Sequence, residues 1–188
     1  MAGTPEKQHN QEGCVSIHCV VKKTKLKDVL LIKPYVFRDR RGEYAEIYHK
    51  RHYFSKGIDI SFVEDDISVS RKGVLRGLHG DDRTWKLISC LWGEFYFVVV
   101  NCDTASRQFG KWVSFTLSAK NRLQVLVPPK HGNGHFVLSD RAVFHYKQSH
   151  YYDPSRQFTY TWDEPRFKIV WPTKRPVLSK RDRVGHYV

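Results

Sequence analysis

Three side chains suited to acid–base chemistry stand close together in the sequence: Arg76, His79 and Lys86. Gly73 and Gly77 precede the histidine and would let a backbone or a ligand approach closely. Two neighbouring cations disfavour a protonated imidazole, so His79 could accept a proton. Guanidinium and ammonium groups also suit a phosphate or a developing oxyanion. The cluster therefore predicts proton abstraction from an anionic substrate.

A glycine-rich segment, residues 128–136, carries two further histidines, His131 and His135. Two histidines four apart can bind a metal ion, as in many jelly-roll proteins. Gly132 and Gly134 argue against a helix that would present both rings on one face, and no His-x-His pair precedes a suitably spaced Glu. We therefore expect no metal here. The favoured interpretation is a glycine-rich turn that enters a strand, with Asn133 as a polar residue of a pocket.

Two more residues could complete an acid–base pair. Strand alternation places Tyr146 on one face with Phe144, and a phenol that faces a polar cavity can donate a proton. The same spacing also fits a tyrosine packed in the core. Near the end of the chain, Asp182 is either a surface charge in a basic segment or a carboxylate that orients a catalytic histidine. Spacing leaves both alternatives open.

Short strands separated by turn residues must position these groups. One segment, residues 50–56, has a helical pattern. Many short strands without helical crossovers predict an all-β domain, a β-sandwich or jelly roll. Alternation and β-forming residues predict strands at 29–33, 43–48, 61–69, 87–91, 95–100, 112–117, 122–127, 142–148, 158–162 and 169–171.

Composition narrows the class of protein further. The 188 residues carry a formal net charge of +13, but Lys and Arg are scattered along the chain, which disfavours a nucleic-acid-binding protein. No apolar run is long enough for a membrane span, and four cysteines without C-x-x-C spacing indicate free thiols in the cytoplasm. We expect a partly mobile N-terminal tail over residues 1–25 and one domain over 26–188.

Several motifs in order resemble the dTDP-4-dehydrorhamnose 3,5-epimerase family of nucleotide-sugar epimerases. Residues 37–46 look like its F-x-D-x-R-G segment, and the resemblance extends from about Leu26 to Asp182. The other matching elements are residues 73–79, 86–87, 109–112, 117–118, 128, 138–139, 146–147, 151–152 and 171–172.

The resemblance implies roles for individual residues. His79 would remove the proton next to a C4 ketone, Asp182 would orient it, Tyr146 would return a proton from the opposite face, and Lys86 would stabilise the enolate. The substrate would be a nucleotide-linked 4-keto-6-deoxy sugar, inverted at C3, C5 or both. Its diphosphate and base would be held by Arg76, Arg41, Phe37, Tyr44, Glu46, Asn133 and Tyr151 or Tyr152.

The family also implies a cupin-type jelly roll with peripheral strands and few short helices, without cofactor or metal. It commonly forms homodimers that exchange N-terminal strands, which would bring Arg41 and Tyr44 to the partner's site. Some residues depart from the common pattern: Asn133 replaces a histidine, Asp81 and Asp82 follow Gly80, and Glu64 and Asp66 replace amides. These departures look closer to a branch that acts on GDP-4-keto-6-deoxy-heptoses. A 3,4-ketoisomerase on the same fold and a metal-dependent cupin are the alternatives.

Overall fold

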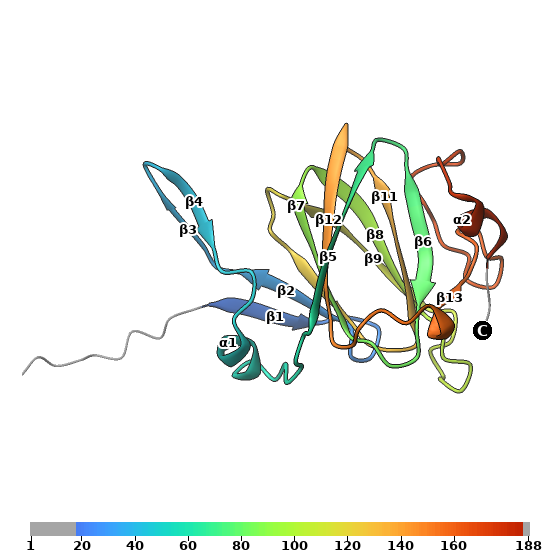
Figure 1. The fold of residues 1–188 in the computed structure, drawn as a ribbon, viewed down its shortest axis with the longest axis horizontal. Helices are drawn as coiled ribbons and strands as arrows, with labels where there is room; N and C mark the ends of the chain where they lie inside the picture. The colour runs from blue at the N-terminus through green and yellow to red at the C-terminus, as the bar shows by residue number, and fades with distance from the viewer. Residues whose placement is uncertain (1–17, 186–188) are drawn as a thin grey trace, which may run out of the picture.

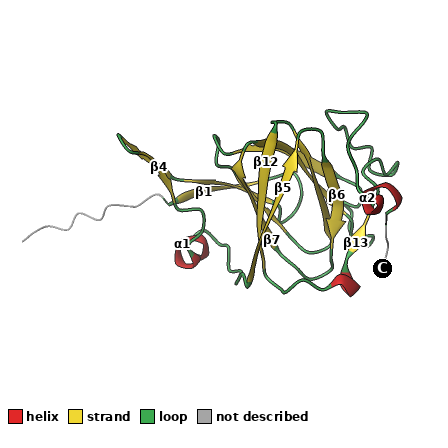
Figure 2. Cartoon of the chain, turned by 45° about the horizontal axis from the view of Figure 1, so that its top comes forward, coloured by secondary structure: helices red, strands yellow, loops and turns green. Residues whose placement is uncertain are grey.

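Two antiparallel sheets packed face to face form the body of the protein (Figure 1). The computed structural model describes residues 18–185. The six-stranded sheet has the order β1-β2-β10-β7-β12-β5, and the five-stranded sheet has the order β13-β6-β11-β8-β9. The predicted all-β jelly roll is confirmed, and the helices are short (Figure 2). No helix in residues 18–185 is long and apolar enough to cross a membrane.

The strands of the two sheets have these bounds. The six-stranded sheet contains β1 (Cys19–Lys23), β2 (Leu30–Pro34), β10 (Gln124–Val127), β7 (Lys86–Trp92), β12 (Arg141–Gln148) and β5 (Glu64–Arg71). The five-stranded sheet contains β13 (Phe158–Thr159), β6 (Leu75–Gly80), β11 (His131–Val137), β8 (Glu94–Asn101) and β9 (Trp112–Ser118). The helical elements are α1 (Lys50–Phe54), a 3₁₀ turn (Pro154–Arg156) and α2 (Lys180–Val184).

Strand β8 shows why the sequence folds into layers. Its residues Phe95, Phe97 and Val99 pack in the core between the two sheets, and Val98 and Val100 pack in a second cluster on the other side. That second cluster includes residues from the C-terminal loops that cover the outer face of the five-stranded sheet. A strand covered on both faces needs a continuous apolar run, as predicted for residues 95–100.

The close approach of β6 and β11 depends on glycine. Gly77 has a φ of 132°, and a Cβ atom there would lie 2.8 Å from the carbonyl oxygen of Asn133. The register pairs Asn133 with His79, so the absence of a side chain at Gly77 keeps these two polar residues on adjacent strands. Because β11 pairs along its whole length with β8, residues 131–137 are strand, where the sequence predicted a turn at their start.

A hairpin of β3 (Val36–Asp39) and β4 (Gly42–Ala45) stands away from the body (Figure 1). Its two strands pair with each other and form a separate two-stranded sheet. Strands β1 and β2, in contrast, belong to the chain's own six-stranded sheet.

The observed elements correct several predictions. Strand β5 begins at Glu64, where the sequence predicted a start at residue 61, and β13 ends at Thr159, where it predicted an end at residue 162. Strand β1 lies inside the predicted tail of residues 1–25, so the folded domain begins before residue 26; residues 1–17 lie outside the described part. An edge strand with charges at its end has too weak an alternation to be found. The strand predicted at 43–48 ends at Ala45, and residues 169–171 are loop, where the Trp171 indole N–H donates to the carbonyl of Trp162 at 2.8 Å.

Candidate active site

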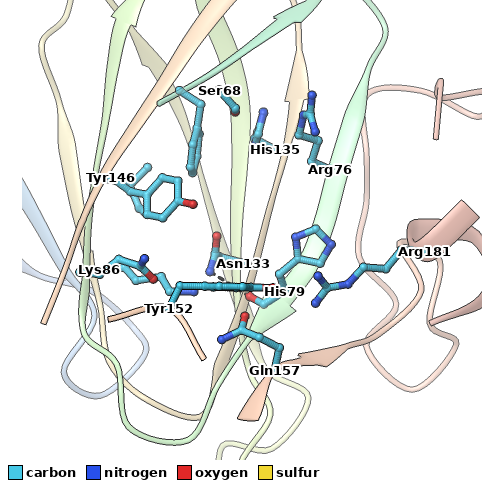
Figure 3. Close-up of a pocket in the computed structure, with 13 residues that line it drawn as sticks. Ser68, Arg76, His79, Lys86, Asn133, His135, Tyr146, Tyr152, Gln157 and Arg181 are labelled. Atoms are coloured by element: carbon cyan, nitrogen blue, oxygen red, sulfur yellow. Dashed lines mark hydrogen bonds between the residues drawn. The ribbon is translucent and has the colours of Figure 1, made fainter. Parts of the chain in front are cut away.

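A cavity of about 210 Å³ opens between the two sheets (Figure 3). Strand alternation explains most of its wall: Phe144, Tyr146 and Gln148 are alternate residues of β12. The β12–β7 register pairs Gln148 with Lys86, whereas His79 comes from β6 in the opposite sheet. The complete lining is Ser68, Arg76, His79, Lys86, Ile88, Asn133, His135, Phe144, Tyr146, Gln148, Tyr152, Gln157 and Arg181.

His79 forms an ion pair or hydrogen bond with Asp182 of α2. Its Nε2 atom lies 2.7 Å from Oδ1 of Asp182, and Asp182 is 3% exposed. Ser179, the N-cap of α2, donates its hydroxyl to the other carboxylate oxygen at 2.7 Å. Burial raises the pKa of Asp182, but the hydrogen bonds from His79 and Ser179 outweigh it and hold that pKa below its ordinary value. A charged carboxylate therefore orients the imidazole from behind.

Tyr146 faces the cavity from the other sheet (Figure 3). Burial, together with the nearby carboxylates of Asp66 and Glu64, raises the pKa of its phenol to about 12. Gln148 holds both acids, donating to Glu64 at 2.6 Å and to Asp66 at 3.1 Å. Tyr146 is therefore a protonated phenol at neutral pH, suited to donate a proton.

Lys86 is a buried basic residue of the cavity wall. It is 8% exposed, and its Nζ atom lies 3.7 Å from Oδ2 of Asp81. Asp81 is itself fixed by the backbone N–H groups of Arg83 and Thr84, at 3.0 and 2.6 Å. Burial lowers the pKa of Lys86, and the charge of Asp81 counteracts this effect. A desolvated ammonium group interacts strongly with a developing oxyanion because little water screens it.

Other polar groups surround these residues. Asn133 donates to the carbonyl of His79 at 2.9 Å, so it fixes the strand that carries the histidine. Arg76 donates to Ser70 at 3.0 Å, and Arg181 donates to Thr159 at 2.7 Å. Both guanidinium groups line the cavity, which suits a ligand with several negative charges.

His135, which the sequence suggested only as a possible metal ligand, is a buried residue of the cavity wall. It is 4% exposed, its ring stacks on Phe144 at 4.3 Å, and Nε2 has no hydrogen-bond partner among the described residues. Burial, together with the charge of Arg76, lowers the pKa of His135 to about 3. His135 is thus a neutral ring packed like an aromatic residue. Its position two residues after Asn133 on one strand was the signal that could have found it.

The buried His135 predicts a specific acid sensitivity. Its pKa is lower in the folded state than in the unfolded chain, so the unfolded chain binds the proton first and stability falls as the pH drops below about 6.5. Between about pH 7.5 and pH 5 this loss is about 2 kcal/mol of unfolding free energy. His135→Phe should remove that part of the pH dependence, measured by urea unfolding. The exposed control His150→Phe should keep it, and equal slopes for both variants would contradict the assignment.

The structure brings part of the predicted site together. His79, Lys86, Tyr146, Arg76, Asn133 and Tyr152 line the cavity, and Asp182 lies directly behind His79. Phe37, Arg41 and Tyr44 instead lie on the β3–β4 hairpin, away from this cavity.

Two more predicted residues lie elsewhere. Glu46 contacts His52 at 2.6 Å, and Tyr151 is 71% exposed and does not line the cavity. Gln157 and Arg181 were missed because they reach the wall from loops and from α2, and no periodicity in the sequence indicates that approach.

Comparisons with known proteins agree with this architecture. The family model of dTDP-4-dehydrorhamnose 3,5-epimerase matches residues 23–188. An enzyme of that name from Shigella flexneri is 39% identical over 169 residues, which cover 88% of this chain and 93% of that protein. A crystal structure of dTDP-6-deoxy-D-glucose-3,5-epimerase from Legionella pneumophila, in complex with dTDP-4-keto-L-rhamnose, has a TM-score of 0.84 and 36% identity, covering 88% of this chain and 90% of that one. A 3'-monoepimerase from Streptomyces bikiniensis, in complex with dTDP-quinovose, has a TM-score of 0.79 and 26% identity, covering 85% and 83%.

Proposed function

The chain belongs to the dTDP-4-dehydrorhamnose 3,5-epimerase family, and from this premise we propose how its cavity inverts a sugar carbon. The protein is an isomerase that epimerises a nucleotide-linked 4-keto-6-deoxy sugar. One observation carries the assignment of residues: a histidine backed by a buried carboxylate faces a protonated tyrosine across one cavity.

His79 is the base in this proposal. When its Nε2–H donates to Asp182, the lone pair is on Nδ1, which accepts the proton from the carbon next to the C4 ketone. The C–H bond breaks, its electron pair forms the enolate, and negative charge develops on the C4 oxygen. Asp182 then stabilises the imidazolium ion, and Lys86 stabilises the enolate oxygen.

Tyr146 completes the inversion as the acid on the opposite face. Its phenol gives a proton to the carbon as the enolate collapses to the ketone, so the carbon receives its new C–H bond on the face opposite to the one it lost. The imidazolium of His79 then releases its proton to solvent and the phenolate recovers one, which restores both groups. The two groups come from different sheets, which supports removal of the proton on one face of the sugar ring and its return on the other.

The substrate's diphosphate meets the cationic part of the wall. We propose that Arg76 and Arg181 contact it, because both line the cavity and a phosphate accepts from guanidinium groups in pairs. Tyr152 lines the same wall and is placed to contact the nucleotide, whereas Tyr151 lies at the surface.

A homodimer would bring the hairpin residues to the site. The β3–β4 hairpin exposes Phe37 at 52% and Tyr44 at 68%, and an isolated hairpin is marginally stable in water. We propose that this hairpin, with Arg41, reaches the nucleotide in the cavity of a second copy. The exchanged element is then the hairpin, since β1 and β2 pair within their own chain. Light scattering that gives the mass of one chain would contradict this proposal.

The identity of the sugar and of the nucleotide depends on residues that differ from the common pattern. Glu64 and Asp66 flank Tyr146, and Asn133 sits beside His79, so these residues lie next to both reacting groups. We propose that they adapt the cavity to a 4-keto-6-deoxy sugar other than the rhamnose precursor, GDP-linked heptoses included. We also propose a cytoplasmic location, in keeping with the free thiols of Cys19, Cys90 and Cys102; cell fractionation tests it.

Isotope exchange in D2O tests the function directly. The protein is incubated with dTDP-linked and GDP-linked 4-keto-6-deoxy sugars, and NMR locates the deuterium. Deuterium at C3, C5 or both, with the ketone still at C4, is the expected result, and the better substrate identifies the nucleotide. A ketone at C3 would indicate a 3,4-ketoisomerase instead. Absence of exchange with every 4-keto sugar would contradict the proposed reaction.

A further inference from the structure

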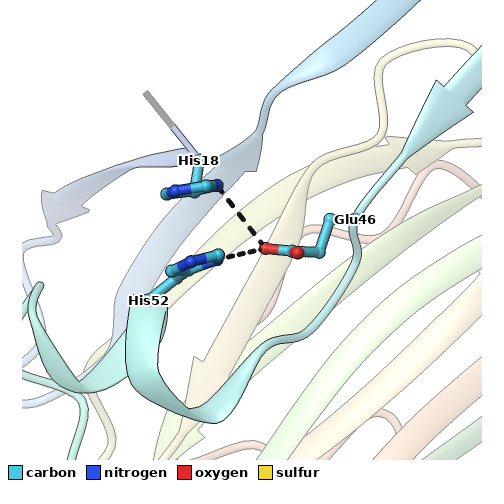
Figure 4. Close-up of side chains that lie close together, drawn as sticks. All are labelled: His18, Glu46 and His52. Atoms are coloured by element: carbon cyan, nitrogen blue, oxygen red, sulfur yellow. Dashed lines mark hydrogen bonds and ion pairs between the residues drawn. The ribbon is translucent and has the colours of Figure 1, made fainter. Parts of the chain in front are cut away.

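A cluster of three potential metal ligands lies outside the cavity, at the root of the β3–β4 hairpin (Figure 4). His18 directly precedes β1, Glu46 directly follows β4, and His52 lies in α1. Their ligand atoms lie within 4.8 Å of one another. Three segments of the chain therefore meet at one point, and each supplies a donor atom.

The two histidines turn the same ring nitrogen to the same carboxylate oxygen. Nδ1 of His52 lies 2.6 Å from Oε1 of Glu46, and Nδ1 of His18 lies 3.8 Å from it. The imidazole rings stack with centroids 3.2 Å apart and planes 9° apart. The contact of His52 with Glu46 is a hydrogen bond, whereas the 3.8 Å contact of His18 is within ion-pair distance but too long for a hydrogen bond. Both ring nitrogens and the carboxylate oxygen therefore already lie on one side of the cluster, where a shared ion could meet all three.

We propose that His18, Glu46 and His52 bind a divalent transition-metal ion of the zinc class. Two imidazole nitrogens and one carboxylate oxygen form a donor set that zinc, cobalt and nickel accept, whereas calcium and magnesium prefer oxygen ligands. The three side chains are 26–32% exposed, which leaves room for a water molecule as a fourth ligand. Because the two rings are nearly parallel, the His18 ring must tilt toward a shared ion, and its 32% exposed side chain permits this movement.

His49 supports the arrangement from the other side. Its ring stacks on His52 with centroids 3.8 Å apart and planes 17° apart, so it restricts the plane in which His52 presents its nitrogen. Packing that fixes the orientation of a ligand raises the affinity of a metal site.

An ion at this point would have a structural consequence. Glu46 directly follows the last residue of β4, and His18 directly precedes β1, so the ion would tie the hairpin to the body of the protein. The site lies apart from His79 and Tyr146, and the metal binding proposed here does not depend on the epimerisation chemistry.

Metal titration of the full chain, without an affinity tag and after treatment with chelator, tests the proposal. Zn²⁺ binding is measured by calorimetry, and Co²⁺ binding by the visible absorption of the bound ion. We expect one ion per chain, with affinity lowered more than about tenfold in both His18→Gln and His52→Gln, since even outer contacts of a metal site contribute tenfold or more. The exposed control His150→Gln should bind as the wild type does.

A separate measurement must show that both ligand variants fold, so that a loss of metal binding is not a loss of structure. Both should keep the wild-type circular dichroism, because both side chains are partly exposed and lie outside the core between the two sheets. Absence of binding by the wild type, or unchanged affinity in a folded His52→Gln, would overturn the metal site. Absence of epimerisation by the wild type would instead count against the proposed function. The failure of the metal site and the failure of the proposed function are therefore distinguishable.

Discussion

Replacement of His79 by asparagine should lower kcat by about a hundredfold to ten-thousandfold, the contribution typical of a positioned general base. The asparagine side chain can still donate to Asp182, which is 3% exposed. The buried carboxylate therefore keeps a hydrogen-bond partner, and the variant should fold. No lone pair of comparable basicity remains to accept the proton. Deuterium incorporation from D2O should therefore disappear together with epimerisation, while nucleotide binding, measured by calorimetry, stays close to that of the wild type.

Asp182→Asn is the matched variant for this experiment. It keeps the base but removes the charge that lies 2.7 Å from the imidazole, so His79 should retain measurable exchange at a reduced rate. Because Asp182 touches the histidine and does not line the cavity, it acts as a positioning residue. Full isotope exchange in His79→Asn would show that another group removes the proton.

The sequence predicted the elements that carry the chemistry because strand alternation is a local signal. Tyr146 and Lys86 lie on strands whose alternate residues face inward, and the run of residues 95–100 marked the strand at the centre of the body. The pairing of His79 with Asp182 joins positions far apart in the chain. Spacing alone did not decide whether Asp182 is a surface charge or a group that orients His79. The family resemblance indicated the pairing.

Other features depend on packing that no local pattern encodes. His135 reads as part of a polar, glycine-rich turn, yet it is buried against Phe144 because β11 lies between β6 and β8. Arg181 and Gln157 reach the cavity through the course of the C-terminal segments. The cluster around Glu46 likewise forms when the start of β1, the end of β4 and α1 come together. Each of these contacts is a consequence of topology.

Replacement of Tyr146 by phenylalanine should separate proton removal from inversion. The variant keeps His79, Asp182 and Lys86, so the enolate can still form and deuterium can still enter from the face of the base. The opposite face loses its donor, because the phenol that is protonated at neutral pH is gone. Formation of the inverted sugar should fall by about a hundredfold or more, whereas exchange with retained configuration persists.

The comparison variant is Tyr152→Phe, which removes another phenol from the cavity wall. Tyr152 is proposed to contact the nucleotide, so its loss should raise KM and leave the ratio of inversion to exchange unchanged. NMR of the product in D2O measures both quantities in one sample. If Tyr146→Phe inverts the carbon as fast as it exchanges deuterium, the acid must be another residue. The carboxyl groups of Glu64 and Asp66 beside Tyr146 would then be the next candidates, since burial and Glu64 together raise the pKa of Asp66 and favour its protonated form.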